Sequence, residues 1–228
     1  MRVEPLAFAE EFEGLRLPAE TVHHLRRVRR VRDGERFYVG DGEGRVVAVA
    51  FHGEELRALG EVISFRERPE RIGVAMFMPS RERLSWAVQK LAELGVDDIY
   101  LLVAGHDRRQ GALLSAAAVG RLERIVREAS QQSERVFLPR VWPNLPAGEF
   151  ITTRGGEIAI LDPQGGVPSL ERRIWLVGPE SGRVDAGEGV PRYRISSSIL
   201  RVESAALVAG AFMCGLSERI VVSSSVVC

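Results

Sequence analysis

The chain has 228 residues, with 31 basic and 31 acidic side chains and 45% hydrophobic residues. That length allows one large domain or two modest ones, and the composition is that of an ordinary globular protein rather than of a disordered chain. No apolar run approaches the roughly 20 residues that cross a bilayer, and the acidic segment 1–13 lacks the apolar stretch of a secretory signal. We therefore expect a cytoplasmic protein that does not bind a membrane.

Residues 1–68 have the pattern of short strands separated by turns. Strand-like stretches lie at 36–39, 46–51 and 59–65. The sequence Asp-Gly-Glu-Gly at 41–44 predicts a hairpin, because glycine tolerates positive φ. Together these elements predict a small β-barrel or sandwich. The charged segment 66–71 contains Pro69 and no long apolar run, which predicts a linker to a second domain over 69–228.

The second domain is predicted to alternate strands with helices. Continuous apolar runs predict buried strands, and apolar residues at helical spacing predict helices. In chain order these are strand 72–78, helix 81–94, strand 99–103, helix 115–133, strands 158–161, 174–177 and 193–195, and helix 203–214. This alternation predicts an α/β fold with a mostly parallel sheet.

Three of these strands end in loops rich in glycine, proline and serine. The loops are 162–166, 178–182 and 196–198, the last followed by Ile199, Leu200 and Arg201. In open α/β sheets, ligands bind beyond the carboxyl ends of the strands, where small residues let a ligand approach the backbone. We therefore expect the three loops to form one pocket, although glycine and proline are also ordinary turn residues.

Several common sites are disfavoured by the sequence. No G-x-G-x-x-G or G-x-x-x-x-G-K-[ST] pattern occurs, which disfavours a conventional dinucleotide or triphosphate site. The two cysteines, Cys214 and Cys228, and the four histidines lack metal-ligand spacing, so we expect no metal. No G-x-S-x-G elbow is present, which disfavours a hydrolase triad.

A cluster of arginines lies in the N-terminal domain. It comprises Arg26, Arg27, Arg29, Arg30 and Arg32. In a helix these guanidinium groups would form a surface that contacts nucleic-acid phosphates. The alternative is a solvated helix, because acidic residues outnumber arginines over residues 1–70.

Five segments, taken in order, resemble one protein family. The first is His24-Leu25 with Val28, Arg30, Gly34-Glu35 and Asp41-Gly42, and the second is QKLAELGV at 89–96. The third is Glu128-Ala129 with Gln132-Ser133, Arg135 and Pro139. The fourth and fifth are LVGPESG at 176–182 and ILRVESAA at 199–206. The sequence is similar to the RsmE-type 16S ribosomal RNA uridine-N3 methyltransferases of the SPOUT, or α/β-knot, superfamily.

The resemblance implies a PUA-like β-barrel at 1–68 and a SPOUT methyltransferase domain at 69–228 with a deep trefoil knot. It implies a homodimer that methylates N3 of a uridine in 16S rRNA of the small ribosomal subunit, with RNA and not DNA as the partner. S-adenosylmethionine would bind in the three loops. The contacts implied are Leu161, Asp162, Pro163, Leu176, Val177, Gly178, Pro179, Glu180, Gly182, Ile195, Ser196, Ser198, Ile199, Leu200 and Ser204.

Methylation at N3 requires the imide proton to leave and the charge on the uracil O2 and O4 atoms to be stabilised. Positioning and electrostatics should therefore dominate catalysis. Arg201 is the first candidate for a catalytic cation facing these oxygens, and a salt bridge that stabilises the knot is its alternative role. Glu180 or Glu203 would orient Arg201 or the cofactor, and no residue stands out as a general base.

The resemblance also implies contacts with RNA, and the chain departs from the family pattern at several positions. The implied RNA contacts are Arg26, Arg27, Arg29, Arg30, Arg32 and Arg108, with His106 as the alternative to Arg108. The chain has Ser181, Arg183 and Ser-Ser-Ser at 196–198 where the family has Gly, commonly Phe, and Gly-Pro-Arg. These departures leave open a SPOUT-fold RNA-binding or ribosome-assembly protein with weakened transferase activity, or a methyltransferase acting on another RNA position.

Overall fold

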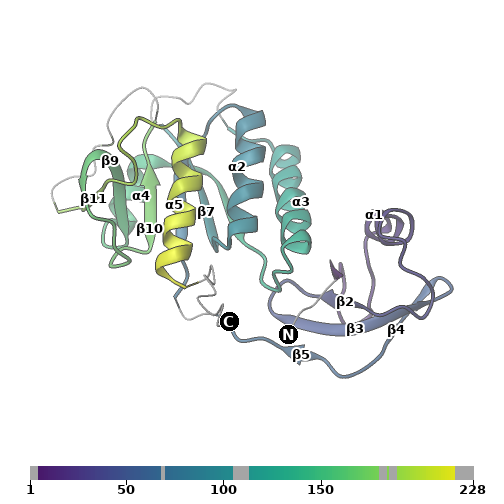
Figure 1. Cartoon of the computed structure of the whole chain (residues 1–228). Coiled ribbons are helices and arrows are strands. Elements are labelled where there is room, and N and C mark those ends of the chain that lie inside the picture. Colours follow the sequence, from purple (N-terminus) through teal and green to yellow (C-terminus); the bar gives the residue numbers. More distant parts are fainter. Residues whose placement is uncertain (1–4, 68–69, 105–112, 180–183, 185–188, 219–228) are drawn as a thin grey trace. The chain divides into compact units, whose positions relative to one another are not determined.

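The computed structural model describes residues 5–67, 70–104, 113–179, 184 and 189–218. The chain divides into two compact units (Figure 1). The N-terminal unit is Met1–Pro69 together with Arg127–Leu138, and the C-terminal unit is Glu70–Val126 together with Pro139–Cys228. A segment that is remote in sequence therefore completes the N-terminal unit.

A five-stranded sheet forms the centre of the N-terminal unit. Its strands are β1 (Leu6–Phe8), β2 (Phe37–Gly40), β3 (Arg45–His52), β4 (Glu55–Ala58) and β5 (Ile63–Ser64). The order is β1-β2-β3-β4, with β5 also paired to β3. Strands β1 and β2 run parallel, and the other pairs run antiparallel. Helix α1 (Ala19–His23) continues directly into a short π-helix, η1 (His24–Val28).

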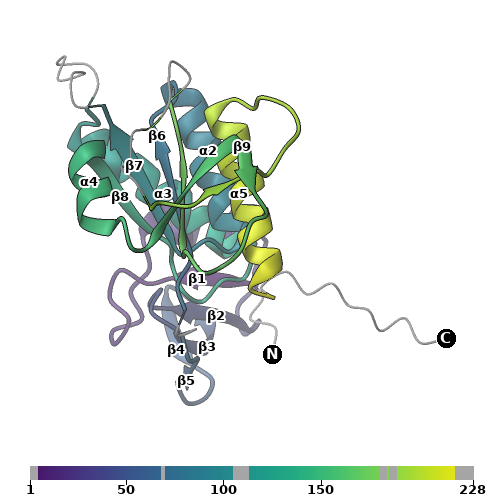
Figure 2. The ribbon, with the colours of Figure 1, turned by 90° about the vertical axis from the view of Figure 1, so that its left-hand side faces the viewer.

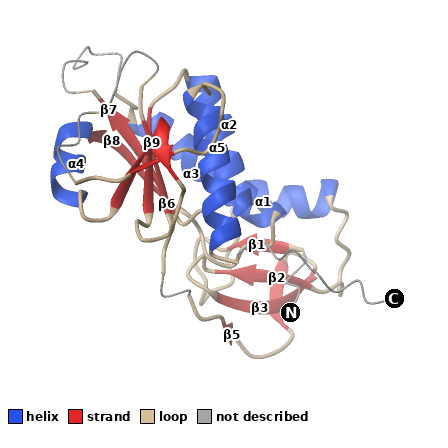
Figure 3. Cartoon of the chain, turned by 60° about the vertical axis from the view of Figure 1, so that its left-hand side comes forward, coloured by secondary structure: helices blue, strands red, loops and turns tan. Residues whose placement is uncertain are grey.

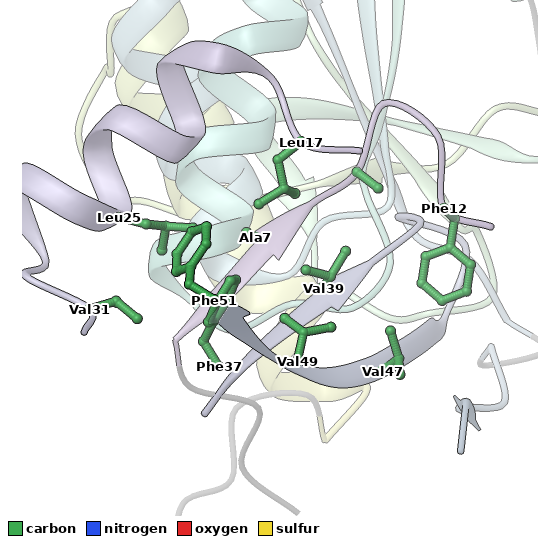
Figure 4. Packing of buried hydrophobic residues seen from close by; sticks show 11 residues of the cluster. Ala7, Phe12, Leu17, Leu25, Val31, Phe37, Val39, Val47, Val49 and Phe51 are labelled. Atoms are coloured by element: carbon green, nitrogen blue, oxygen red, sulfur yellow. The ribbon is translucent and has the colours of Figure 1, made fainter. Parts of the chain in front are cut away.

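The core of this unit lies between the sheet and the α1–η1 segment. Figure 4 shows Leu25, from η1, beside the aromatic rings of β2 and β3. The rings of Phe37 and Phe51 pack with their centroids 5.0 Å apart, and both side chains are fully buried. Burial of such aromatic side chains contributes on the order of 2–3 kcal/mol each. The apolar side of the arginine-bearing helix is thereby fixed to the sheet.

The strand predicted at 59–65 is confirmed only at 63–64, as β5, and the longer strand β4 precedes the predicted range. The chain pairs with β3 at 55–58 and again only at 63–64, while Leu59 and Val62 are about half exposed (49% and 47%). Strand β4 lies at an edge of the sheet and its side chains are mostly exposed. It therefore lacks the apolar alternation from which a half-buried strand is predicted.

The hairpin predicted at 41–44, between β2 and β3, is confirmed, and residues 137–138 pair with its turn. Leu138 donates its backbone N–H to the Gly42 carbonyl at 2.8 Å, and Glu43 pairs with Phe137 in an isolated antiparallel bridge. Gly42 and Gly44 have φ of +83° and +100°. A Cβ on Gly42 would lie 2.8 Å from Leu138 Cγ. The turn and the close approach both require glycine here.

The C-terminal unit is built on a six-stranded parallel sheet. Its strands are β6 (Gly73–Phe77), β7 (Asp98–Val103), β8 (Arg140–Pro146), β9 (Ile158–Gly166), β10 (Ile174–Val177) and β11 (Arg192–Tyr193). The order is β11-β9-β10-β6-β7-β8, and every neighbouring pair is parallel. The predicted α/β fold with a mostly parallel sheet is thereby confirmed.

Helices cover both faces of this sheet. The helices are α2 (Arg81–Leu94), α3 (Ala116–Gln132), α4 (Ala147–Arg154) and α5 (Val202–Leu216). Helices α2 and α5 lie on one face and α4 on the other (Figures 2 and 3). Helix α2 has the bounds predicted from its apolar spacing and ends at Gly95, whose φ is +107°. A Cβ on Gly210 of α5 would lie 2.8 Å from Leu91 Cδ2, so glycine permits the close packing of α5 on α2.

Two elements of this unit are absent from the sequence prediction. Strand β8 contains Pro143 and Pro146, which cannot donate to a ladder, and it forms at an edge of the sheet where this is tolerated. Helix α4 is short, and only Ala147 and Phe150 in it are buried, so its apolar pattern is weak. No helix in the described ranges is long and apolar enough to span a membrane.

Candidate functional site

A cavity of about 340 Å³ lies at the carboxyl end of β10, along residues 160–164 of β9 and beside the segment that follows β11. These three strands are parallel neighbours, so their carboxyl ends meet at one edge of the sheet. All three predicted segments contribute to its wall, as expected. Residues 162–166, however, were predicted as a loop and belong to the irregular second half of β9, which pairs with β11 again at Gly166. The lining residues are Ile160, Leu161, Asp162, Pro163, Gln164, Val177, Gly178, Pro179, Val184, Arg192, Tyr193, Ile195, Ser196, Ser198, Ile199, Leu200 and Ala205.

A bulge at the end of β9 forms one wall of this cavity. Strand β11 pairs with β9 through Arg192 and Ile160, and next through Tyr193 and Gly166. Residues 161–165 therefore bulge out between two consecutive pairs of the ladder. Bulges of this kind redirect side chains and are common beside functional sites. Here the bulge turns the first predicted loop toward the cavity.

Backbone contacts hold both ends of the bulge against β11. Ile160 donates its N–H to the Pro191 carbonyl, and Arg194 donates its N–H to the Gly166 carbonyl, each at 2.9 Å. Between them Gly165 approaches β11 so closely that a Cβ would lie 2.6 Å from a backbone carbon of that strand. Only glycine fits at this point without displacing one of the two strands.

The Asp162 side chain lies at the centre of the polar contacts in the wall. Its Oδ1 accepts the Gln164 backbone N–H at 2.8 Å, which closes a turn inside the bulge. Its Oδ2 accepts Nη1 of Arg192 at 2.9 Å. Nη2 of the same arginine donates to the Val184 carbonyl at 3.3 Å. One guanidinium therefore connects the bulge to the segment that follows the second loop.

The third loop is shaped by its serines. Ser196 Oγ accepts the backbone N–H of Ser198 at 3.0 Å, a local side-chain to backbone bond that stabilises a tight turn. Both serines line the cavity, so the residues that replace Gly-Pro-Arg leave it open. Ile199, which follows them, is 91% exposed although it also lines the cavity.

Arg201 and Glu203 lie at the start of α5, next to the third loop. Arg201 is the N-cap residue with extended backbone (φ −66°, ψ 159°), and its side chain is exposed. Glu203 is buried, and its Oε1 lies 3.5 Å from Arg83 Nε on α2. Its Oε2 has no hydrogen-bond partner among the residues that the structure describes. The ion pair of Glu203 is therefore with Arg83, on the neighbouring helix.

The residues predicted to contact the cofactor fall into three groups. Those that line the cavity are Leu161, Asp162, Pro163, Val177, Gly178, Pro179, Ile195, Ser196, Ser198, Ile199 and Leu200. Leu176 and Ser204 are not among the lining residues, since Leu176 is fully buried within the sheet and Ser204 lies on α5. Glu180 and Gly182 lie outside the described residues.

Sequence reasoning missed several lining residues. These are Ile160, Gln164, Val184, Arg192, Tyr193 and Ala205. Gln164 lies inside the first predicted loop, so its position was a usable signal. Arg192 carries no such signal, because it reaches the cavity only through the pairing of β11 with β9.

The arginines of the cluster in the N-terminal unit differ in their contacts. Arg26 donates to Asp33 and to the Gly53 carbonyl, and its guanidinium lies 3.9 Å from the ring centroid of Phe51. The Arg26 hydrogen bond, followed by that from the Gly53 N–H, lowers the pKa of the Asp33 carboxyl below its ordinary value. The other members of the cluster are exposed; they are Arg27, Arg29, Arg30 and Arg32. Arg108 and His106 lie outside the described residues.

Comparison with known families decides how this site is interpreted. The model of the RNA methyltransferase domain family matches residues 66–214. The chain belongs to this family. The model of the RNA methyltransferase PUA domain matches residues 17–63, within the N-terminal unit of this RNA methyltransferase.

Individual relatives resemble this RNA methyltransferase over most of its length. The ribosomal RNA small subunit methyltransferase E of Synechocystis is 29% identical over an alignment 225 residues long, which covers 89% of this chain and 73% of that protein. The crystal structure of a probable rRNA-methyltransferase from Porphyromonas gingivalis has a TM-score of 0.77 and 25% identity, covering 94% of this chain and 99% of its own. A ribosomal RNA small subunit methyltransferase E from Neisseria gonorrhoeae, bound to S-adenosyl methionine, has a TM-score of 0.75 and 26% identity, covering 93% and 97%.

The described part of this RNA methyltransferase holds no group of three histidine, cysteine, aspartate or glutamate side chains placed to bind a metal ion. The candidate site consists of the cavity and the charged residues around it, which are Asp162 and Arg192 in the wall and Arg201 at the start of the adjoining helix.

Proposed function

We propose that this RNA methyltransferase transfers the methyl group of S-adenosylmethionine to N3 of a uridine in the 16S rRNA of the small ribosomal subunit. The observation that carries the proposal is the single cavity made by three loops at the carboxyl edge of the sheet. Two relatives support the choice of donor and substrate: the Synechocystis protein is a small subunit rRNA methyltransferase, and the Neisseria gonorrhoeae protein was crystallised with S-adenosyl methionine.

The walls of the cavity suit a nucleoside that carries an amino-acid tail. Ile160, Val177 and Leu200 provide apolar surface for a purine ring, and Gly178 lets a ligand approach the backbone. The carboxylate of Asp162 accepts hydrogen bonds from hydroxyl or ammonium groups. The volume of about 340 Å³ lies within the range of about 300–1,000 Å³ for small-molecule sites. When bound, S-adenosylmethionine supplies an electrophilic methyl group on a sulfonium.

The protein's own contribution to the reaction is to position the uracil and to stabilise charge. N3 of uracil is a protonated imide, so its proton must pass to water before the N3 lone pair forms a bond to the methyl carbon, and the bond from that carbon to sulfur breaks to leave S-adenosylhomocysteine. The negative charge then spreads over O2 and O4. Arg201 suits this role because its side chain is exposed beside the third loop. A cation that is already in place where negative charge develops lowers the barrier strongly.

Replacement of Arg201 tests this assignment. Arg201→Ala should lower kcat by about 10²-fold, while the Kd for S-adenosylmethionine changes by less than about twofold. The exposed Arg194, whose side chain is not part of the cavity wall, provides the control as Arg194→Ala. An equal loss of turnover and cofactor affinity in Arg201→Ala would remove the role assigned to Arg201.

The N-terminal unit is proposed to hold RNA through its exposed arginines. Arg27 and Arg29 are exposed, whereas Arg26 is bound to Asp33 and to Gly53 within its own unit. Each phosphate contact that is lost should reduce the slope of log K against log salt concentration by about 0.7–0.9. Alanine at Arg27 and Arg29 should thus flatten that slope by about 1.5. An unchanged slope in filter-binding assays would contradict the placement.

The assembly is proposed to be a homodimer, as in the family that the sequence resembles. Helices α2 and α5 pack together and expose large apolar side chains, namely Trp86 (43%), Phe212 (45%) and Leu216 (49%). A second copy that packs against these helices would cover exposed apolar side chains of this kind. Analytical ultracentrifugation of the wild type and of Phe212→Asp tests it, and a monomeric wild type at micromolar concentration would refute it.

The resemblance also supports finer features of the fold and its location. We infer closure of the N-terminal sheet into a PUA-like barrel, a trefoil knot in the C-terminal unit, and a cytoplasmic protein. The return of the chain from the edge strand β11 to α5, which packs on α2 and β6, is consistent with such a knot. A crystal structure with a continuous trace through residues 178–202 tests the knot.

The activity itself is tested in cells. Ribosomal RNA from a deletion strain, measured by mass spectrometry, should lack one N3-methyluridine. The wild-type gene should restore this nucleoside, and the gene with Arg201→Ala should not. Calorimetry measures the affinity for S-adenosylmethionine, which a methyltransferase must bind. It thereby distinguishes this function from that of an RNA-binding protein with weakened transferase activity. Normal methylation in the deletion strain would refute the proposed substrate.

A further inference from the structure

We propose that Arg192 is a positioning residue that holds the loops of the cavity in the geometry that binds the methyl donor. The inference rests on the proposed function and deepens it. It assigns a role to a residue that lies outside the segments 176–182 and 199–206, which carry the resemblance around the site.

The geometry of one guanidinium carries the inference. Arg192 stands on β11, just before the third loop. Its Nη1 donates to Asp162 Oδ2 at 2.9 Å, in the bulge that forms the first loop. Its Nη2 donates to the Val184 carbonyl at 3.3 Å, on the segment after the second loop. A single planar group on β11 therefore contacts both the bulge and Val184, and a lysine ammonium lacks the two-armed geometry to do the same.

The bond to Asp162 is shielded and is part of a chain of contacts. The Asp162 side chain is only 13% exposed, while that of Arg192 is 39% exposed. The second oxygen of Asp162 already accepts the Gln164 N–H, so the carboxylate connects the turn inside the bulge to Arg192. Replacement of Arg192 would remove a hydrogen bond between two charged groups from a carboxylate that is mostly buried, and hydrogen bonds of this kind are the strong ones. We therefore expect the bulge to rearrange when Arg192 is replaced.

The shape of the bulge matters because it supplies Leu161, Asp162, Pro163 and Gln164 to the cavity wall. Arg192 touches the walls of the site and contributes no group to the reacting atoms. An interaction of this kind stabilises the bound ground state and the transition state equally. Its loss should raise KM for the donor and leave kcat almost unchanged.

The experiment measures affinity and catalysis for a matched set of variants of the full chain. The variants are Arg192→Met, Arg192→Lys, Asp162→Asn, the double variant Asp162→Asn with Arg192→Met, and the control Arg194→Met. Calorimetry gives Kd for S-adenosylhomocysteine, and methyl transfer to a small-subunit rRNA transcript gives KM and kcat. Thermal unfolding reports whether each variant folds.

Arg192→Met should raise Kd and KM by about five- to tenfold with kcat within about twofold of the wild type. Arg192→Lys should fall between Arg192→Met and the wild type. The loss of affinity in the double variant should be smaller than the product of the two single losses, because each single variant already removes the hydrogen bond between Arg192 and Asp162. Arg194→Met should bind as the wild type does, since this side chain is not part of the wall.

Three results would overturn the inference: an unchanged Kd in Arg192→Met, a fall in kcat at constant KM, or additive effects in the double variant. If Arg192→Met does not fold, Arg192→Lys decides, and wild-type affinity in that variant overturns the inference. A wild-type protein that binds neither S-adenosylmethionine nor S-adenosylhomocysteine refutes the proposed function itself. Tight wild-type binding with no effect at Arg192 refutes only the positioning role.

Discussion

Gly165→Ala places a methyl group where the end of β9 meets β11. The new Cβ would lie 2.6 Å from the carbonyl carbon of Tyr193 and 2.7 Å from two backbone atoms of Arg192. Ordinary contacts begin at 3.4 Å, so the two strands must separate by about 0.8 Å, the difference between these distances. Because the obstructing atoms are backbone, no side chain can turn aside. Overpacking of this kind costs about 1–3 kcal/mol.

The same displacement should damage the cavity, because the bulge that carries Asp162 is anchored on both sides of Gly165. A misplacement near 1 Å can cost about 10²-fold in rate, so we expect Gly165→Ala to weaken S-adenosylhomocysteine binding at least about tenfold. Calorimetry measures the affinity, and urea unfolding measures the free energy of unfolding.

Gly156→Ala is the matched control for this substitution. Gly156 belongs to the same unit, and a Cβ there would meet nothing within 4 Å. This variant should bind the ligand with wild-type affinity. Wild-type affinity and stability in Gly165→Ala would refute the argument that the approach of β9 to β11 shapes the cavity.

Two further predictions concern the N-terminal unit. Gly44→Ala and Gly53→Ala both place alanine at positive φ, but only at Gly44 would the new Cβ collide with the Phe137 ring. Gly44→Ala should therefore lower the free energy of unfolding, measured by urea titration, by about 1–3 kcal/mol more than Gly53→Ala does. Equal losses in the two variants would contradict this. Burial raises the pKa of the Asp41 carboxyl, but hydrogen bonds from the Arg45 side chain and from two backbone N–H groups outweigh it and lower the pKa below its ordinary value. A depressed pKa gives stability that is complete above the unfolded-state pKa and is lost as pH falls through the folded-state pKa. Asp41→Asn should therefore destabilise by about 1–2 kcal/mol at pH 7 and by clearly less at pH 3; the same loss at both pH values would refute this sign.

Local patterns in the sequence were sufficient wherever an element is buried in a regular way. Helix α2 was predicted with its observed bounds because Leu84, Val88 and Leu91 recur at helical spacing and Gly95 ends it. The central strands β6 and β10 were recognised because both of their faces are covered, which leaves continuous apolar runs. Elements with weak burial, such as β4 and α4, left no pattern to recognise.

The candidate site likewise combines features that local sequence predicts with contacts that only the folded structure shows. The sequence by itself determined that three glycine-, proline- and serine-rich loops follow strands of an α/β sheet, because turn residues are a local signal. Only the tertiary structure decided that β11 pairs with β9 across a bulge, which places Arg192 against Asp162. It also decided that Glu203 pairs with Arg83 and that residues 127–138 join the N-terminal unit. Contacts between residues far apart in the chain depend on how whole elements pack, and no local spacing encodes that packing.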